Sequence, residues 1–336
     1  MIKKPFIIAE IGLNHNGSFE LAKKSVEAAA EVGVSAVKFQ NFITEDFVQD
    51  KKITHEYKFK NRVVKQSLYQ ICKNAEYKEE WTEKLVKICK KKKIEFISTP
   101  TSFSGVDHLK KHKLKFIKNG SDFLPHLELI KYMAIKNFQI ILSTGMAELA
   151  DITAAVNIIK KNSKKDPIIL HCVSQYPTEN RYVNLKRISS IKKEFKTICG
   201  FSDHTEGFEA AIQALSYGSL IFEKHFTLNK KLKGPDHFFS LNPAEMKNYV
   251  KKIKEGFIRL GSEKIEPALI EKKFRNKVRL GLMFNKDLIK GQKLTYKDYV
   301  LQKNCPGILP REVKNYIGKK VIKDVKKGTV IKKNIF

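Results

Sequence analysis

The chain has 336 residues, of which 42% are hydrophobic and 30% charged, a balance that excludes a wholly disordered protein. No run of about eighteen apolar residues occurs, so no membrane-spanning helix is expected. The formal net charge of +30 is spread along the chain without a basic tail, and no helix-turn-helix, zinc-finger or aromatic-basic RNA-binding signature accompanies it. The charge indicates a lysine-rich, solvated surface that would help to attract an anionic substrate. A basic nucleic-acid-binding protein is the less favoured alternative.

Two features indicate a cytoplasmic protein. The first residues are basic and then apolar, but Glu10 interrupts the apolar run and no small-residue cleavage site follows, so this segment is expected to be a strand and not a signal peptide. The five cysteines are odd in number and form no C-x-x-C pair, which fits reduced thiols and neither a disulfide framework nor a zinc ribbon.

Short β-branched or apolar runs alternate with amphipathic helical segments through the first 260 residues or so. Strands are predicted over 6–12, 36–42, 94–100, 115–120, 139–145, 167–173, 197–203 and 219–226. Helices are predicted over 21–33, 126–137, 151–162 and 206–218, among others. Eight βα units are the number that closes a (β/α)8 TIM barrel, although an open doubly wound sheet alternates in the same way. The segment 43–80 is too long for a plain βα turn, and we expect it to touch substrate.

After a helix predicted over 244–261 the pattern changes. We predict a barrel domain over 1–262, a charged linker over 263–276 and a small β-rich domain over 277–336. The phrase K-D-x-x-K-G occurs twice in this last part, at 286–294 and, in looser form, at 323–331.

Reactive groups of a barrel sit at the carboxyl ends of its strands, where the loops surround a common pocket. The expected strand ends carry Glu10; Lys38 and Gln40; Thr99; Lys118 and Ser121; Ser143; Ser174 and Tyr176; Ser202, Asp203 and His204; and Glu223, Lys224 and His225. Lysines beside hydroxyl groups form a good pocket for phosphate or carboxylate oxygens. The alternative is that Lys38 and Lys118 only extend from the rim into solvent.

His204 and His225 end the last two predicted strands, which adjoin in a closed barrel. Because neighbouring strands lie about 4.8 Å apart, the two imidazoles can converge on one cation and leave positions open for substrate or water. Taken singly, each histidine is more often a hydrogen-bonded rim residue. His15, in the N-H-N-G turn, is expected only to pack there.

Several stretches closely resemble the sialic acid (N-acetylneuraminate) synthase family: AEIGLNHNG (9–17), VKFQNF (37–42), ISTPTSF (97–103), IILSTGMAE (140–148), CVSQYPT (172–178), GFSDHTEG (200–207) and FEKHFTLNKKLKGPDHFFS (222–240). KDLIKGQKLT and CPGILP near the C-terminus resemble that family's antifreeze-like (SAF) domain. The likeness covers nearly the whole chain.

The resemblance implies a cytoplasmic enzyme that condenses phosphoenolpyruvate with a mannosamine-type sugar aldehyde to a nine-carbon 2-keto acid and phosphate, by C–O cleavage. It implies a dimer in which each SAF domain covers the partner's barrel. It also implies a divalent cation on His204 and His225, usually manganese, with magnesium or cobalt as alternatives.

The resemblance and the strand-end residues together give three sets of expected site residues. The catalytic residues are expected to be Glu10, Lys38, Lys118 and Glu223. Phosphoenolpyruvate contacts are expected from Lys38, Thr99, Lys118, Ser121, Ser143, Ser174 and Ser202. Sugar contacts are expected from Gln40, Asp122, Tyr176, Asp236 and, from a partner subunit, Cys305.

Three departures from the family pattern lie on the acceptor side, so the sequence leaves the sugar open. Phe123 stands where the family has an acid, for which Asp122 is the candidate substitute; Cys305 stands where the family commonly has arginine; and Ser174 where it often has asparagine. N-acetylmannosamine, its 6-phosphate and 6-deoxy diacetamido sugars all remain candidates. A different barrel aldolase, with Lys38, Lys118 or Lys224 as a Schiff-base nucleophile, is the alternative enzyme.

Overall fold

The computed structural model describes residues 2–59 and 62–336. The chain divides into two compact units, the first ending at Gly261 and the second comprising Ser262–Phe336. Within the described ranges, no helix combines the length and the apolar character needed to cross a bilayer.

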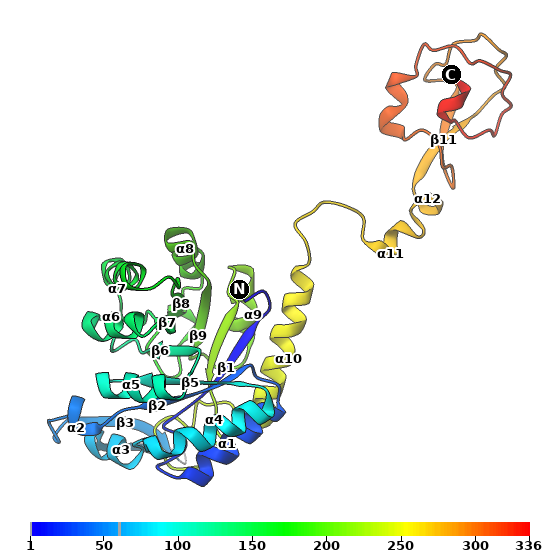
Figure 1. Cartoon of the computed structure of the whole chain (residues 1–336). Coiled ribbons are helices and arrows are strands. Elements are labelled where there is room, and N and C mark those ends of the chain that lie inside the picture. The colour runs from blue at the N-terminus through cyan, green and yellow to red at the C-terminus, as the bar shows by residue number, and fades with distance from the viewer. Residues whose placement is uncertain (1, 60–61) are drawn as a thin grey trace. The chain divides into compact units, whose positions relative to one another are not determined.

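The first unit is built on an eight-stranded parallel sheet formed by described residues, in the order β5-β2-β1-β10-β9-β8-β7-β6 (Figure 1). The end strands β5 and β6 also lie in contact, so the sheet closes on itself. The strands are β1 (Phe6–Gly12), β2 (Ala36–Asn41), β5 (Glu95–Pro100), β6 (Phe116–Asn119), β7 (Gln139–Ser143), β8 (Ile168–Cys172), β9 (Cys199–Asp203) and β10 (Ile221–His225). The predicted TIM barrel is therefore confirmed.

Helices follow the strands and surround the barrel. They are α1 (Phe19–Glu31), α4 (Thr82–Lys92), α5 (Phe103–Lys111), α6 (Leu127–Ile135), α7 (Leu149–Asn162), α8 (Lys186–Phe195), α9 (Glu209–Ser216) and α10 (Pro243–Leu260). The last begins with a capping box, in which Asn242 and Glu245 each bond the other's backbone N–H and Pro243 occupies the first helical position.

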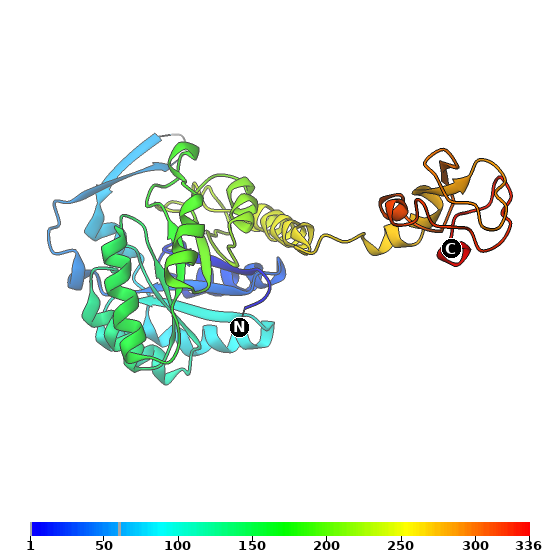
Figure 2. The same ribbon diagram turned by 90° about the horizontal axis from the view of Figure 1, so that it is seen from above.

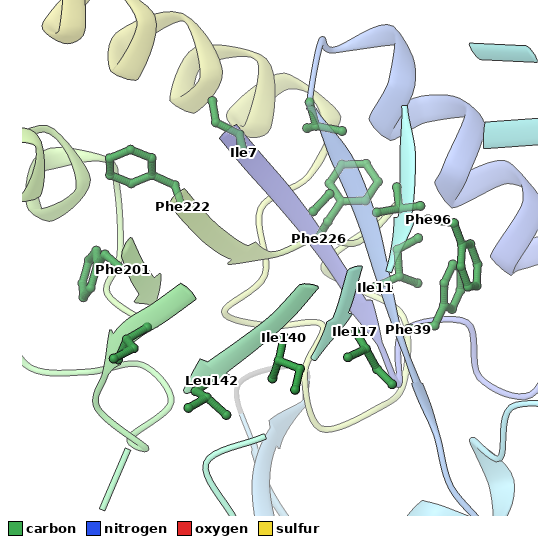
Figure 3. Close-up of a cluster of buried hydrophobic side chains, with 14 of the residues drawn as sticks. Ile7, Ile11, Phe39, Phe96, Ile117, Ile140, Leu142, Phe201, Phe222 and Phe226 are labelled. Carbon is green, nitrogen blue, oxygen red and sulfur yellow. The ribbon is translucent and has the colours of Figure 1, made fainter. Parts of the chain in front are cut away.

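Two apolar layers hold the first unit together. One lies between strands and helices and includes Phe39 and Phe96, whose rings stack with centroids 5.5 Å apart (Figure 3). The other fills the barrel interior and consists of Ile8, Ala36, Ile97, Phe116, Ile141, Ile168, Leu170 and Ile221. Alternate residues of a strand face opposite sides, so most of the barrel strands contribute to both layers.

The long segment after β2 contains α2 (Thr44–Phe47), an antiparallel hairpin of β3 (Thr54–Phe59) and β4 (Arg62–Ser67), α3 (Leu68–Asn74) and a short 3₁₀ turn, η1 (Glu79–Trp81). Figure 2 shows the hairpin, in light blue, extending along one side of the first unit. A second 3₁₀ turn, η2 (Asn180–Tyr182), lies between β8 and α8.

The second unit has its own core, which includes Leu282, Phe284, Val321 and Ile331. It contains α11 (Leu269–Lys272), α12 (Arg275–Val278), the antiparallel pair β11 (Leu280–Phe284) and β12 (Tyr299–Lys303), and the 3₁₀ turns η3 (Pro310–Asn315) and η4 (Lys333–Ile335).

The repeated K-D-x-x-K-G phrase has a structural meaning in the second unit. Asp287 of the first copy accepts a hydrogen bond from the N–H of Lys327 in the second copy, and Asp324 accepts the equivalent bond from Lys290. Leu288 and Val325 pair between the copies. The two copies are thus joined by equivalent, reciprocal hydrogen bonds. The assignment of this unit as an SAF domain stays a prediction.

Candidate active site

The candidate site arises from a change of side-chain type along the inward face of six barrel strands. Two residues beyond the apolar interior layer, the inward positions become polar: Ile8 is followed by Glu10, Ala36 by Lys38, Ile97 by Thr99, Phe116 by Lys118, Ile141 by Ser143, and Ile221 by Glu223. The strands lie in register, with Glu10 beside Lys38 and Glu223 beside Ser202. The interior of the barrel is therefore apolar toward the amino ends of the strands and polar at their carboxyl ends.

These polar groups line a cavity of about 570 Å³. The residues of the first unit that were expected in the catalytic, phosphoenolpyruvate, sugar and metal sets all line it: Glu10, Lys38, Gln40, Thr99, Lys118, Ser121, Asp122, Ser143, Ser174, Tyr176, Ser202, His204, Glu223, His225 and Asp236. Asp203 and Lys224, which were also expected at strand ends, do not line it. Residues from every barrel strand or its following loop thus meet at one place, while their individual roles stay predictions.

Two buried lysines and two buried glutamates form the floor of the cavity. The Nζ atom of Lys38 lies 3.3 Å from both Glu10 Oε2 and Glu223 Oε1. The Nζ atom of Lys118 lies 3.8 Å from Glu223 Oε1 and donates to Ser143 Oγ at 2.5 Å. Because these ammonium groups are 5% exposed or less, their field acts in a low-dielectric environment.

The two glutamates have different acidities. Burial raises the pKa of Glu10 to about 7, although the Lys38 ammonium opposes the rise. Burial also acts on Glu223, but Lys118 and Lys38 overcome it and lower the pKa of that carboxyl to about 2. At neutral pH, Glu223 is an anion and Glu10 exchanges a proton readily, which is the separation that acid–base chemistry uses.

Several buried polar atoms around the floor have no hydrogen-bond partner within the described chain. They are the second carboxylate oxygen of Glu223 and the hydroxyl groups of Thr99, Thr101 and Ser174. Buried polar groups are normally paired, and unpaired hydroxyl groups beside two ammonium groups suit the oxygens of an anionic ligand.

The two predicted metal-binding histidines lie side by side, with ring centroids 5.4 Å apart. His204 Nδ1 lies 2.8 Å from the carbonyl oxygen of Val173, to which it donates a hydrogen bond, so that Nε2 is left as a ligand. His225 Nδ1 is buried and has no hydrogen-bond partner in the described chain, and the nearest carboxylate, Asp236 Oδ2, is 3.6 Å away.

The protonation of the histidines bears on whether they can hold a cation. Burial, with His204 and Lys38, lowers the pKa of His225 well below its usual value, so this ring is neutral. Burial acts in the same direction on His204, but Cys172 and the Val173 carbonyl raise its pKa, and a cation would displace that proton. The pair fits a cation with two protein ligands and open positions; no cluster of three or more His, Cys, Asp or Glu ligands occurs in the described ranges.

Aromatic side chains form the outer part of the cavity. Tyr176 lies against His204, with centroids 4.2 Å apart, and Phe239 packs against both Tyr176 and His225. On another side, Phe47 of α2 packs on Phe123 at 6.3 Å. Phe123, at the position where the resemblance implies an acid, thus has an apolar partner in this chain.

Sequence reasoning missed some of the residues that line the cavity. His55, Glu56 and Tyr57 come from the β3–β4 hairpin, inside the segment that was expected to touch substrate without any residue being singled out. The alternation of THEYKF is a weak strand signal. His15 is fully buried and its ring packs on Trp81, as expected for a packing residue.

Cys305 lies in the second unit. It is 4% exposed, and its thiol donates to the carbonyl oxygen of Lys303. Its expected contribution to a partner's site stays a prediction.

Residues 25–265 match the model of the NeuB family. The chain belongs to this family. It is 36% identical over 330 residues to the N,N'-diacetyllegionaminic acid synthase of Legionella pneumophila, with 97% of this chain and 93% of that protein covered. It is 32% identical to a pseudaminic acid synthase of Campylobacter jejuni, with 99% and 97% covered.

The fold comparison agrees with the sequence comparison. The crystal structure of N-acetylneuraminic acid (sialic acid) synthetase from Leptospira borgpetersenii, in complex with citrate, matches with a TM-score of 0.73 and 32% identity, covering 81% of this chain and 90% of that one. Membership of the NeuB family makes this chain an enzyme, and the cavity described above is its candidate active site.

Proposed function

We propose that this NeuB-family chain is a nonulosonic acid synthase, which condenses phosphoenolpyruvate with an N-acylated amino-sugar aldehyde to a nine-carbon 2-keto acid and inorganic phosphate. The observation that carries the proposal is the floor of the cavity, where Lys38 and Lys118 lie beside unpaired hydroxyl groups and next to His204 and His225. Membership of the family and the names of the relatives support the reaction class.

Phosphoenolpyruvate binds on this floor in the proposal. The ammonium groups of Lys38 and Lys118 hold its carboxylate and phosphate, and the hydroxyl groups of Thr99, Ser121, Ser143, Ser174 and Ser202 donate to the remaining oxygens. Ammonium-to-phosphate bonds are stronger than neutral hydrogen bonds, so this set fixes the donor in one orientation.

His204 and His225 would hold a divalent cation, for which we propose manganese. When bound, the cation supplies Lewis acidity toward the oxygen of the sugar aldehyde. The neighbouring rings of Tyr176 and Phe239 limit the access of water to that place.

The reaction requires a proton at the aldehyde oxygen and removes one from water. The C3 carbon of phosphoenolpyruvate forms the new C–C bond with the aldehyde carbon, and the aldehyde oxygen takes a proton, which we assign to Glu10. Water then adds at C2 and gives a proton to the Glu10 carboxylate. The C2–O bond to phosphate then breaks as the new C2 hydroxyl group passes its proton to the departing phosphate and becomes the keto group. Glu223 remains an anion and stabilises the positive charge that develops at C2.

The acceptor in this proposal is an unphosphorylated amino sugar with acyl and methyl groups. Among the described residues that line the cavity, the lysines and arginines are Lys38 and Lys118 alone, and both are assigned to phosphoenolpyruvate. The outer wall offers aromatic faces, such as Phe47 and Phe123, that suit apolar substituents and not a phosphate.

The proposal is tested by measuring phosphate release from phosphoenolpyruvate in the presence of manganese. The acceptors compared are a 6-deoxy diacetamido mannose-type sugar, N-acetylmannosamine and its 6-phosphate. We expect release with the unphosphorylated sugars, highest with the deoxy sugar, and unlabelled phosphate when the reaction runs in ¹⁸O-water. Release without any acceptor sugar, or labelled phosphate, would contradict the mechanism.

We further propose that the enzyme works in the cytoplasm as a homodimer. Free thiols at all five cysteines support a reducing compartment. Light scattering of the purified chain should give twice the 38.7 kDa mass of one chain.

A further inference from the structure

A buried ion pair lies directly behind the two histidines. Asp203 and Lys224 stand opposite each other in the register of β9 and β10, with Lys224 Nζ 3.1 Å from Asp203 Oδ2. Each is 1% exposed. Neither lines the cavity, because strand residues alternate and these two face outward, toward α10.

Both charged groups of this pair make further hydrogen bonds. Asp203 Oδ1 accepts from the N–H of Thr205 at 2.9 Å and from its hydroxyl at 2.7 Å, and Asp203 Oδ2 also accepts from the hydroxyl of Tyr249 at 3.1 Å. Lys224 donates to the carbonyl oxygen of Thr205. A buried ion pair is costly unless its hydrogen bonds are satisfied, and here they are.

The placement of the pair matters for the residues that follow it. His204 comes directly after Asp203, and His225 directly after Lys224. The N–H of Thr205 is held by Asp203 and its carbonyl oxygen by Lys224, so both members of the pair hold the backbone that directly follows His204. The side chains of the two histidines point the opposite way, into the cavity.

We propose that Asp203, Lys224 and Tyr249 are positioning residues, which fix the distance and orientation of His204 and His225 for a divalent cation. The inference rests on the proposed function, since it uses the two-histidine site. The pair joins the two strands at one level and α10 holds the pair through Tyr249, so the imidazoles cannot separate without breaking buried hydrogen bonds.

The test uses full-length Asp203→Asn, Lys224→Met and Tyr249→Phe, which keep side-chain size. Manganese binding is followed by electron paramagnetic resonance of the free ion, and the geometry of the site by the visible spectrum of bound cobalt. We expect Mn²⁺ affinity to fall about 10-fold to 100-fold in the two charge variants and about 10-fold in Tyr249→Phe, the range seen when outer-shell partners of metal ligands are lost. The cobalt spectrum should change with it.

Tyr77→Phe is the matched control. It also removes a buried tyrosine hydrogen bond, between the hydroxyl groups of Tyr77 and Thr82 at 2.9 Å, but this bond involves neither Asp203 nor Lys224. We expect a similar loss of thermal stability in Tyr249→Phe and Tyr77→Phe, and unchanged Mn²⁺ binding in the latter. If a charge variant fails to fold, the comparison of Mn²⁺ binding between Tyr249→Phe and Tyr77→Phe is sufficient to test the positioning role.

Two results would overturn the inference in distinguishable ways. Mn²⁺ affinity and a cobalt spectrum that stay at wild-type values in Tyr249→Phe and in every charge variant that folds would remove the positioning role alone. Wild-type binding that does not depend on His204 and His225, measured with His204→Ala and His225→Ala, would overturn the proposed metal site as well.

Discussion

Glu10 is the residue whose protonation should be visible in the rate. Burial raises its pKa to about 7, so its carboxyl is protonated below that pH and can donate to the aldehyde oxygen. We expect kcat to fall as pH rises through about 7, because the acid form is lost. Glu10→Gln cannot titrate; it should lower kcat about 10²-fold to 10⁴-fold, the usual contribution of general acid–base catalysis, and abolish this inflection.

Glu56→Gln is the control for this pH profile, since Glu56 also lines the cavity but lies on the hairpin. It should keep the wild-type inflection. A wild-type rate that rises through pH 7, and does so only when Glu10 is present, would mean that this residue enters the reaction as a proton acceptor, which contradicts the assignment.

Lys118 should act mainly on the binding of phosphoenolpyruvate. Lys118 is 1% exposed as a residue and lines the floor of the cavity. A hydrogen bond to a charged group contributes about 1.5–3 kcal/mol, so Lys118→Met should raise KM for phosphoenolpyruvate about 10-fold to 100-fold. Lys115→Met, at an exposed position just before the same strand, should leave KM unchanged. Equal effects of the two substitutions would mean that general charge, and not this site, binds the donor.

At the residue scale, many site residues could be predicted from the sequence, because residues at the carboxyl ends of different barrel strands lie close together in the folded chain. Lys38 and Lys118 are 80 residues apart in the chain, yet both reach Glu223 Oε1 because each follows an inward apolar residue by two positions. The contact between Phe47 and Phe123 could not be predicted, since it depends on the path of an irregular segment. The outward pair Asp203–Lys224 could not be recognised as a network before Tyr249 of α10 was placed.

At the element scale, the eight barrel strands were predicted with bounds close to those observed, because buried parallel strands are short β-branched runs between helical segments. The β3–β4 hairpin was not predicted. Its strands are mostly exposed, with Tyr57 as the buried residue among the described part of β3, so the hydrophobic alternation that marks a strand is nearly absent. Pairing across the hairpin, and not burial, defines these strands.

The aromatic wall formed by Phe47 of α2 and Phe123 should determine the acceptor. Phe123→Glu introduces the acid that the resemblance implies at this position, but places its charge against the ring of Phe47. We expect kcat/KM for the 6-deoxy diacetamido sugar to fall about 10-fold or more, comparable to the loss of an apolar group from a pocket, while KM for phosphoenolpyruvate stays constant.

Phe103→Glu provides the comparison for this wall. Phe103 is 45% exposed and packs on Tyr132, away from the cavity lining. It should leave both constants unchanged. An increase in activity toward the deoxy sugar in Phe123→Glu would contradict an apolar subsite.

At the scale of the whole molecule, the chain combines two units with separate cores and a strong positive charge. The charge is a property of the surface and does not specify the fold. The cavity nevertheless contains two ammonium groups at its floor, so the general field and the local site act on the same anionic substrate. The acceptor sugar is uncharged in the proposal, so neither the general positive field nor the two ammonium groups should affect its binding.

This difference predicts how the two substrates respond to salt. The net charge of +30 should speed the encounter with phosphoenolpyruvate, and salt screens that attraction because the Debye length falls from about 30 Å at 0.01 M to about 8 Å at 0.15 M. We therefore expect kcat/KM for phosphoenolpyruvate to fall several-fold over this range while kcat/KM for the sugar, measured at saturating phosphoenolpyruvate, stays constant. A control at constant ionic strength with different neutral osmolytes separates screening from crowding. If both constants fell together, salt would be acting on the folded state or on the chemical step, and the basic surface would have no part in recruiting the donor.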